Sequence, residues 1–304
     1  MKRMQQPYSH TNRKPCPGRR IVSAILCMIL LLTLALPAMA AEEANTFNLL
    51  LIGEDASAKA ENGRSDAMLL AQITPATGDV KLVSFLRDLY VPVPGHGKTR
   101  LNAAYFYGGE ELLKETLTEC FGVRIDRTMA VDFATMAGLI DQIGGVELEV
   151  TAQEKTELNS ILATYCRDEG IPVDGRLLEN SGLVKLDGLQ ALSFSRIRSL
   201  DSDFGRVGRQ QMVLVGLLKR LTTLDGLTLM GLAIGNLQNV KTDLSLGDLI
   251  GLLPLLSRDG GLRLRSARVP FDDTCRDVQV NGMWVLDCDL AANTGRLQAF
   301  LTEP

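Results

Sequence analysis

Two arginines near the end of a predicted strand are the first residues whose spacing indicates chemistry. Arg196 and Arg198 lie two positions apart in residues 191–198, which we predict to be a strand. Side chains two positions apart on a strand leave the same face. Arg87 directly follows another predicted strand and so shares this strand-end location. Arginine suits phosphate groups because its planar guanidinium donates paired hydrogen bonds.

A second basic group begins a predicted helix over residues 207–221. Arg206, Arg209 and Gln210 are spaced by three and four positions, so they share one helix face. Arginines at a helix N-terminus oppose the helix dipole, which favours anions there. An anion bound between the two basic groups would explain why arginines occur at this helix N-terminus. The sequence therefore predicts a phosphate or pyrophosphate clamp formed by Arg87, Arg196, Arg198, Arg206 and Arg209.

Two aspartates are candidates for a metal site beside this clamp. Asp55 lies at the carboxyl end of a predicted buried strand, where ligands bind in open α/β sheets. Asp66 directly precedes the next predicted strand. Mg²⁺ takes one or two carboxylates when it also binds phosphate oxygens. Mg²⁺ is therefore the predicted cofactor, with Asp55 and Asp66 as its ligands.

Each of these groups also has a purely structural interpretation. Asp201 and Asp203 lie between the arginine pairs, so part of the cluster would be surface ion pairs of small energetic value. Asp55 would then cap a loop, and Arg64 would pair with Asp66. Residue types alone leave both interpretations open.

The elements that must position these residues alternate between strands and helices. We predict strands over residues 47–52, 67–73, 80–86, 146–150 and 191–198, and helices over residues 109–121, 132–142, 207–221, 224–238 and 245–257. The second and third strands are expected to form a hairpin, and residues 152–186 a polar, loop-rich covering segment. This order favours a single three-layer α/β domain, with a mixed central sheet flanked by helices and a C-terminal β-hairpin.

The turn of that C-terminal hairpin is predicted at Asn281-Gly282, because Asn-Gly favours a two-residue type I′ turn. With this turn, Cys275 lies directly opposite Cys288 at a non-hydrogen-bonded pair, where Cα atoms are about 4.5 Å apart. That separation is at the lower edge of disulfide geometry. We predict a Cys275–Cys288 disulfide, which a register slip of one residue would prevent.

Residues 1–41 have the features of an export signal. Residues 1–20 contain basic residues and no acid, residues 21–40 are uncharged, and Ala38-Met39-Ala40 fits a small-x-small cleavage site. Residues 21–41 are also long enough for a transmembrane helix with its basic flank inside. A cleaved signal peptide and an N-terminal membrane anchor both place residues 45–304 outside the cytoplasm, where disulfides form.

The composition of the body excludes several function classes. All 36 acidic residues follow the leader, and an acidic body argues against nucleic-acid binding, which depends on phosphate neutralisation. Of the two histidines, His10 lies in the leader. A Ser-His-Asp site, a Cys-His pair or a multi-histidine zinc site would therefore depend on His96 alone.

Eight short motifs occur in order between about residues 47 and 220, and together they resemble the LytR–CpsA–Psr family. They are Gly-x-Asp (53–55), Arg-Ser-Asp (64–66), Ser-x-x-Arg-Asp (84–88), Leu-Asn-x-Ala (101–104), Gly-Gly-Val (144–146), Leu-Asp-Gly-x-x-Ala-Leu (186–192), Arg-x-Arg (196–198) and Asp-Phe-Gly-Arg-x-x-Arg-Gln (203–210). Two departures affect the loop after the third strand: Leu86 stands where the family commonly has Pro, and Leu89 replaces a frequent Thr.

The resemblance implies a phosphotransferase outside the membrane. Such an enzyme moves a glycopolymer, for example wall teichoic acid or capsular polysaccharide, from a polyprenyl-pyrophosphate carrier onto peptidoglycan. Its partners would be the carrier lipid, peptidoglycan and the membrane. The protein would be secreted or anchored in the cell membrane by a single N-terminal helix.

The resemblance also implies roles for individual residues. Asp55 and Asp66 would hold Mg²⁺. The pyrophosphate would be contacted by Arg64, Arg87, Arg196, Arg198, Arg206 and Gln210, with Arg209 added by the helix-face pattern above. Arg87, Arg196 and Arg198 are the candidate catalytic arginines. Asp88 is a hypothetical base for the acceptor hydroxyl, and its alternative role is an ion pair with a neighbouring arginine.

Two other functions stay open at this point. One is a non-catalytic module that binds polyprenyl-phosphate lipids. The other is a cell-envelope regulator, suggested by the family's older label of transcriptional attenuator, although an exported acidic body disfavours direct DNA contact. A lipid substrate requires an apolar groove, which the sequence does not mark uniquely.

Overall fold

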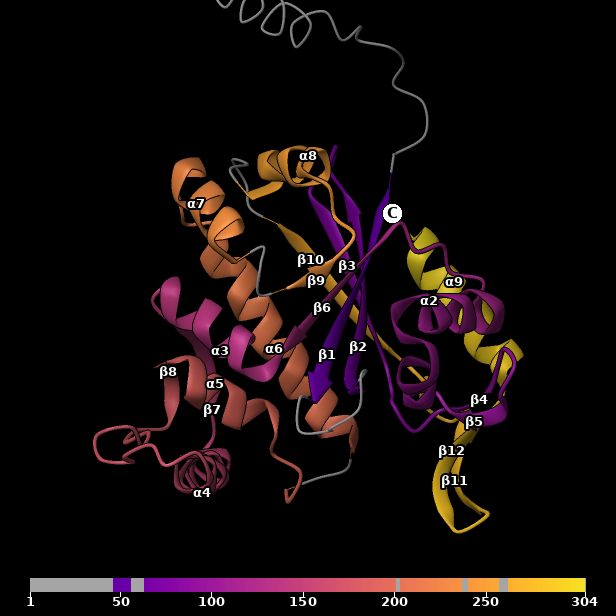
Figure 1. Ribbon diagram of the computed structural model, residues 1–304, viewed down its shortest axis with the longest axis horizontal. Helices are drawn as coiled ribbons and strands as arrows, with labels where there is room; N and C mark the ends of the chain where they lie inside the picture. The colour runs from indigo at the N-terminus through magenta and orange to yellow at the C-terminus, as the bar shows by residue number, and fades with distance from the viewer. Residues whose placement is uncertain (1–45, 56–62, 201–202, 237–239, 257–261, 304) are drawn as a thin grey trace, which may run out of the picture. The chain divides into compact units, whose positions relative to one another are not determined.

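The computed structural model describes residues 46–55, 63–200, 203–236, 240–256 and 262–303 (Figure 1). All of them belong to the unit Asn45–Pro304. The predicted leader, residues 1–41, lies outside the described residues. Among the helices that are described, none has both the length and the apolar character needed to cross a membrane.

A mixed sheet runs through the middle of the described part (Figure 1), with strand order β10-β3-β2-β1-β6-β9. Its strands are β1 (Phe47–Asp55), β2 (Arg64–Thr74), β3 (Asp79–Phe85), β6 (Arg127–Asp132), β9 (Lys241–Thr242) and β10 (Arg263–Val269). β2 pairs antiparallel with β1 and β3, which confirms the predicted hairpin, whereas β6 and β10 add parallel neighbours.

Helices cover both faces of this sheet (Figure 1). The described helices are α2 (Asn102–Phe121), α3 (Phe133–Gln142), α4 (Ala152–Asp168), α5 (Gly188–Ser195), α6 (Asp203–Leu221), α7 (Gly226–Asn236), α8 (Leu246–Leu256) and α9 (Leu290–Thr302). Of these, α4 packs on α5. Alternate residues of β1 face opposite sides, so Leu50 packs with α2 and α9, whereas Leu49 packs with α6. The predicted class, a mixed sheet between helical layers, is confirmed.

Three two-stranded sheets complete the described fold. They are β4 (Tyr90–Val93) with β5 (Gly97–Arg100), β7 (Val146–Val150) with β8 (Gly182–Leu186), and β11 (Cys275–Val280) with β12 (Met283–Cys288). β12 lies against the main body, because its Leu286 forms a bridge to Leu89. The hairpin was predicted to end the domain, but α9 follows it and packs beside α2.

The prediction of a loop-rich segment over residues 152–186 is wrong. This stretch contains α4 and β8. α4 begins with a capping box. The Thr151 hydroxyl accepts from the Glu154 backbone N–H, and the Glu154 carboxylate accepts from the Thr151 backbone N–H. The apolar residues of α4 follow the i, i+3, i+4, i+7, i+8 spacing of an amphipathic helix: Leu158, Ile161, Leu162, Tyr165 and Cys166. The loop prediction followed the overall polarity of the segment and overlooked this helical spacing.

The predicted strand over residues 191–198 is also wrong. Residues Gly188–Ser195 form α5, which begins with a capping box between Asp187 and Gln190. Six of its eight residues are buried, and all eight except Gln190 are apolar or small. A short, continuous apolar run is compatible with a buried strand or a buried helix, and tertiary packing decided between them.

The close approach of α3 and α5 predicts a large effect of the substitution Gly188→Ala. A Cβ atom on Gly188 would lie 2.6 Å from the carbonyl carbon and 2.8 Å from the Cα of Ala137, both backbone atoms of α3. We expect a loss of about 1–3 kcal/mol in the free energy of unfolding, measured by urea denaturation. Gly295→Ala in α9 is the matched control, since nothing lies within 4 Å of its added Cβ. An unchanged Gly188→Ala protein would contradict the tight α3–α5 contact.

The predicted register of the β11–β12 hairpin is confirmed, with Cys275 opposite Cys288. Both residues are free thiols in the structure, and burial raises the pKa of each. The disulfide stays a prediction for the exported protein, where it would add stability at the lower end of about 2–4 kcal/mol. Peptide mapping of the unreduced protein tests it: a peptide pair linked through both cysteines is expected, and two alkylatable thiols would refute it.

Candidate functional site

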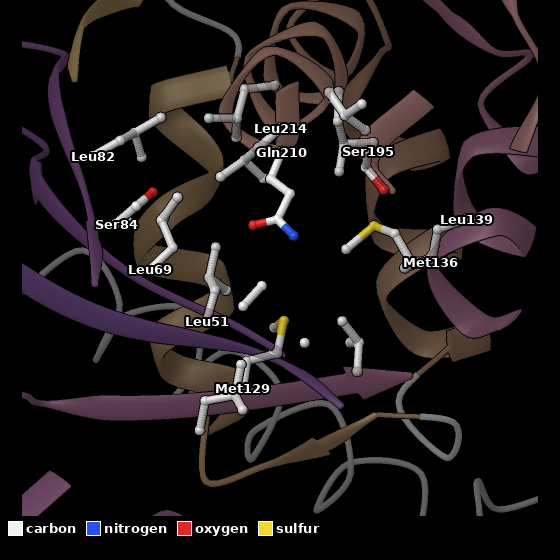
Figure 2. Close-up of a pocket in the computed structure, with 18 of the residues that line it drawn as sticks. Leu51, Leu69, Leu82, Ser84, Met129, Met136, Leu139, Ser195, Gln210 and Leu214 are labelled. Atoms are coloured by element: carbon white, nitrogen blue, oxygen red, sulfur yellow. The ribbon is translucent and has the colours of Figure 1, made fainter. Parts of the chain in front are cut away.

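A deep apolar cavity of about 420 Å³ lies between the sheet and helices α3, α5, α6 and α8 (Figure 2). Its walls are formed mainly by aliphatic and methionine side chains, including Leu51, Leu69, Leu82, Met129, Met136, Leu139 and Leu214. Polar side chains line it where β1 and β3 end and α6 begins. They are Asp66, Ser84, Arg87, Asp132, Ser195, Arg206 and Gln210. We call this polar end the mouth.

Helix α6 shows the change from polar to apolar along the cavity. Arg206, Gln210, Leu214, Leu218 and Leu221 all line it, at intervals of three or four positions that keep them on one helix face. Figure 2 shows the Gln210 amide pointing into the cavity. At 1.5 Å per residue, the distance along α6 from Arg206 to Leu221 is about 22 Å. The helix therefore carries a cation at the mouth and leucines at the inner end.

Asp66 reaches the mouth because of a β-bulge. Gly53 pairs with Ala67, but the next residue, Glu54, pairs with Ser65, so Asp66 is an extra residue in β2. Neighbouring residues of a regular strand point to opposite faces, yet Asp66 and Ala67 both line the cavity. Bulges re-aim side chains in this way beside functional sites.

Arg87 is the partner of Asp66 at the mouth. Its Nη1 donates to Asp66 Oδ1 over 2.7 Å, and the two side chains are 21% and 18% exposed. Arg64, the partner of Asp66 in the purely structural interpretation, is instead exposed and lies over the Phe106 ring, 5.9 Å from its centroid. The structure therefore brings together four of the predicted residues in the cavity lining: Asp66, Arg87, Arg206 and Gln210.

Asp88 lies outside the cavity lining and is paired with arginines. Its Oδ2 is 3.4 Å from Arg87 Nε, and its Oδ1 is 3.2 Å from Arg100 Nε. The Asp88 carbonyl also accepts from the Leu286 backbone N–H of β12 over 2.8 Å. These contacts match the ion-pair alternative, and the role of Asp88 as a base stays a prediction.

Arg196 and Arg198 follow the end of α5 instead of sharing a strand face. Arg196 is the C-cap residue of α5, where the helix dipole favours a cation. Its guanidinium lies 4.4 Å from the ring centroid of Phe133, which lines the cavity, so Arg196 is adjacent to the site. Arg198 is exposed and is not part of the cavity lining.

Arg209 is directed away from the cavity. Its Nε donates to Glu154 Oε1 over 2.9 Å, its Nη1 donates to the Ile197 carbonyl over 3.3 Å, and its side chain is 6% exposed. Burial alone would raise the pKa of Glu154, but hydrogen bonds from Thr151 and Arg209 and the Arg209 charge hold it below its usual value. Arg209 thus connects α6 with α4 and with the segment after α5, a different position from the predicted pyrophosphate contact.

Asp55 is the last residue of β1 and pairs in register with Arg64; its side chain lies outside the described part. Asp66 and Asp132 supply carboxylates at the mouth. Arg87 contacts one oxygen of Asp66 in the bond described above, and one oxygen of Asp132 accepts from the Thr135 backbone N–H. Among the described residues no group of three or more His, Cys, Asp or Glu is placed to hold a metal ion. One or two carboxylates with phosphate oxygens suffice for Mg²⁺, so this donor set fits the ion.

Sequence reasoning missed Ser84, Asp132, Ser195 and the apolar walls of the cavity. β1 is apolar on both faces, and such a strand is normally buried on both. Periodicity therefore could not distinguish the face that lines the cavity from the face that packs under α2.

The fold and site together define an α/β protein with a long apolar cavity that is cationic at one end. Such a cavity fits an amphiphile with an extended hydrocarbon chain and an anionic head. The chain belongs to the LytR_cpsA_psr family, whose sequence profile matches residues 32–298. The resemblance found in the ordered motifs is confirmed.

Curated relatives are named as cell-wall transferases. Polyisoprenyl-teichoic acid–peptidoglycan teichoic acid transferase TagU of Enterococcus faecalis is 32% identical over 209 residues, which cover 67% of this chain and 63% of the relative. TagT of Bacillus subtilis, which carries the same enzyme name, is 29% identical over 218 residues, or 70% of this chain and 65% of the relative. This chain thus spans somewhat less than two thirds of the length of these relatives.

Solved structures share the fold. TagT bound to LIIa-WTA superimposes with a TM-score of 0.68 at 26% identity, covering 88% of this chain and 96% of that one. TagT with bound octaprenyl pyrophosphate lipid has a TM-score of 0.63 at 24% identity, covering 88% and 95%.

Proposed function

We propose that this protein transfers a glycopolymer from a polyprenyl-pyrophosphate carrier onto peptidoglycan outside the membrane. The observation that carries the proposal is the cavity, in which Asp66, Arg87, Arg206 and Gln210 converge at one end of an apolar tunnel. The names of the relatives TagU and TagT support the reaction class. Teichoic acid is therefore the first glycopolymer to test.

In this reaction the polyprenyl chain would lie along α6 and the pyrophosphate would lie at the mouth. A hydroxyl of the wall glycan attacks the glycan-side phosphorus, the bond from that phosphorus to the bridging oxygen breaks, and polyprenyl monophosphate leaves. The hydroxyl proton passes to a base, for which Asp88 is the candidate. Phosphoryl transfer depends chiefly on positioning and on stabilising the developing charge, which Arg87 and Arg206 provide.

Mg²⁺ is proposed as the cofactor, with Asp55 and Asp66 as the residues that would hold it. The ion would supply additional neutralisation of the pyrophosphate charge. Exposed Arg64 and the arginines after α5, Arg196 and Arg198, are proposed to contact the glycan side of the pyrophosphate when substrate is bound.

The location proposed for residues 45–304 is outside the cytoplasmic membrane. It is supported by the basic and apolar pattern of residues 1–41, which suits either a cleaved signal peptide or a single membrane anchor. On this side of the membrane the protein has access to both proposed substrates, the lipid-linked glycan and peptidoglycan.

A transfer assay distinguishes the proposal from its alternatives. The full chain is incubated with a labelled polyprenyl-pyrophosphate glycan and peptidoglycan, with and without Mg²⁺. The enzyme is expected to label peptidoglycan and to release polyprenyl monophosphate when Mg²⁺ is present. Lipid binding without turnover would support a lipid-binding module, and neither binding nor turnover would favour a regulator.

The substitution Asp55→Asn is predicted to weaken the use of Mg²⁺ more than the binding of lipid. We expect the Mg²⁺ concentration for half-maximal transfer to rise about tenfold or more, because even the loss of an outer-shell partner of a metal ligand typically has an effect of this size. Lipid affinity measured without metal is expected to stay unchanged. Equal effects on both measurements would show that Asp55 is structural.

A further inference from the structure

Two helices at the surface carry apolar side chains where polar ones are expected. Leu227 and Ile234 of α7 are 87% and 58% exposed, and Ile250 of α8 is 53% exposed. α7 contains no charged residue, and α8 contains only Asp248. Helices that are apolar on all sides normally lie in a protein core or in a membrane. We call Leu227, Ile234 and Ile250 the α7–α8 surface.

This surface lies at the end of the molecule opposite the mouth. Leu252 and Leu255 of α8 line the inner end of the cavity, together with Leu218 and Leu221 at the end of α6. α7 begins five positions after Leu221. In Figure 1, α7 and α8 lie toward the end at which β1 begins, away from the end at which β1 finishes.

The chain also enters the described body at this end. Thr46 and Phe47 line a surface hollow together with Gly247 and Gly251 of α8. The uncharged segment of residues 21–41 ends five positions before Thr46. Five extended residues span at most about 18 Å, so a membrane that holds this segment passes close to the α8 end of the body.

We propose that the α7–α8 surface rests in the interface of the membrane, so that the inner end of the cavity adjoins the bilayer that supplies the carrier lipid. An apolar helix face without charges inserts about 5–10 Å into such an interface. The mouth then lies farther from the bilayer than the inner end of the cavity, and these two ends are about 22 Å apart along α6, from Leu221 to Arg206. This proposal rests on the proposed function and on an uncleaved N-terminal segment. It identifies the side of the domain that faces the membrane.

Tryptophan fluorescence tests the orientation directly, because the chain contains a single tryptophan. In a Trp284→Phe background, Leu227→Trp and Ile250→Trp are each placed in the full chain, which is reconstituted into vesicles of phosphatidylglycerol and brominated phosphatidylcholine. Leu183→Trp is the matched control, since Leu183 is 72% exposed on β8 and no lining residue of the cavity comes from that strand. Brominated lipid is expected to quench most of the emission at residues 227 and 250 and little of it at residue 183.

Two outcomes would overturn the proposal. The first is an absence of quenching at residues 227 and 250, and the second is quenching equal to that at residue 183. An unquenched emission that is also blue-shifted would mean that protein covers the surface, either residues 21–41 or a second copy of the chain. The measurement needs no turnover, so a failure of the proposed transfer reaction does not affect it.

A second measurement uses Leu227→Glu and Ile250→Glu, which charge the surface without touching the cavity lining. Transfer from a long-chain carrier embedded in vesicles is expected to fall several-fold. Transfer from a short, water-soluble prenyl carrier is expected to stay at the wild-type rate. Equal rates with both carriers, or equal losses with both, would contradict a membrane role for these residues.

Discussion

Arg87→Ala is expected to abolish glycopolymer transfer while leaving the protein folded. Arg87 lines the mouth and is held by Asp66 over 2.7 Å, so its guanidinium is already positioned where the pyrophosphate would bind. Removing one such preorganised donor lowers a rate by about 100-fold or more. Arg87→Lys is expected to fail as well, because an ammonium group does not reproduce paired guanidinium hydrogen bonds. Initial rates of transfer and the thermal midpoint of each variant provide the measurement.

Arg263→Ala is the matched control for this prediction. Arg263 forms an ion pair with Asp79, with 2.7 Å between Nε and Oδ1, but its side chain is 67% exposed and lies outside the cavity. Its removal is expected to leave the rate unchanged. Wild-type turnover in Arg87→Ala would contradict the site, and an equal loss in both variants would show that the effect is not specific to the mouth.

Arg209→Ala is expected to act mainly on stability. Its ion pair with Glu154 is largely buried, with the side chains 6% and 15% exposed. Removing one member of a buried pair leaves the other charge uncompensated, which costs about 3 kcal/mol here, at the lower end of the usual range, since Glu154 keeps its Thr151 hydrogen bonds. For a domain of this size the thermal midpoint should fall by about 6–12 °C.

The rate of Arg209→Ala separates the two roles considered for this residue. At a temperature where the variant is folded, transfer is expected to stay close to the wild-type rate, because Arg209 lies outside the cavity lining. A loss of transfer activity with an unchanged thermal midpoint would instead support the predicted contact between Arg209 and the pyrophosphate. Arg167→Ala is the control, since its exposed pair with Asp168 should contribute less than about 1 kcal/mol.

Local structural elements, and the family indicated by the order of the motifs along the chain, were predictable from the sequence alone. The β2–β3 hairpin, the two central helices α3 and α6, and the β11–β12 register all followed from turn residues, apolar periodicity and pairing arithmetic. The Asn281-Gly282 turn placed Cys275 opposite Cys288 because a two-residue turn determines every pair outward from it. The motif order determined the family, since eight short patterns in series are far more specific than any one.

Only the tertiary structure decided which charged side chains meet. Arg206 and Arg209 lie on adjacent turns of α6, yet Arg206 lines the cavity whereas Arg209 turns to Glu154 of α4, in a segment that was predicted to be loop. Asp66 reaches Arg87 through a one-residue bulge that strand alternation does not predict. The physical reason is common to both cases: sequence spacing determines the face of an element, but partners distant in the chain and local register shifts determine what that face meets.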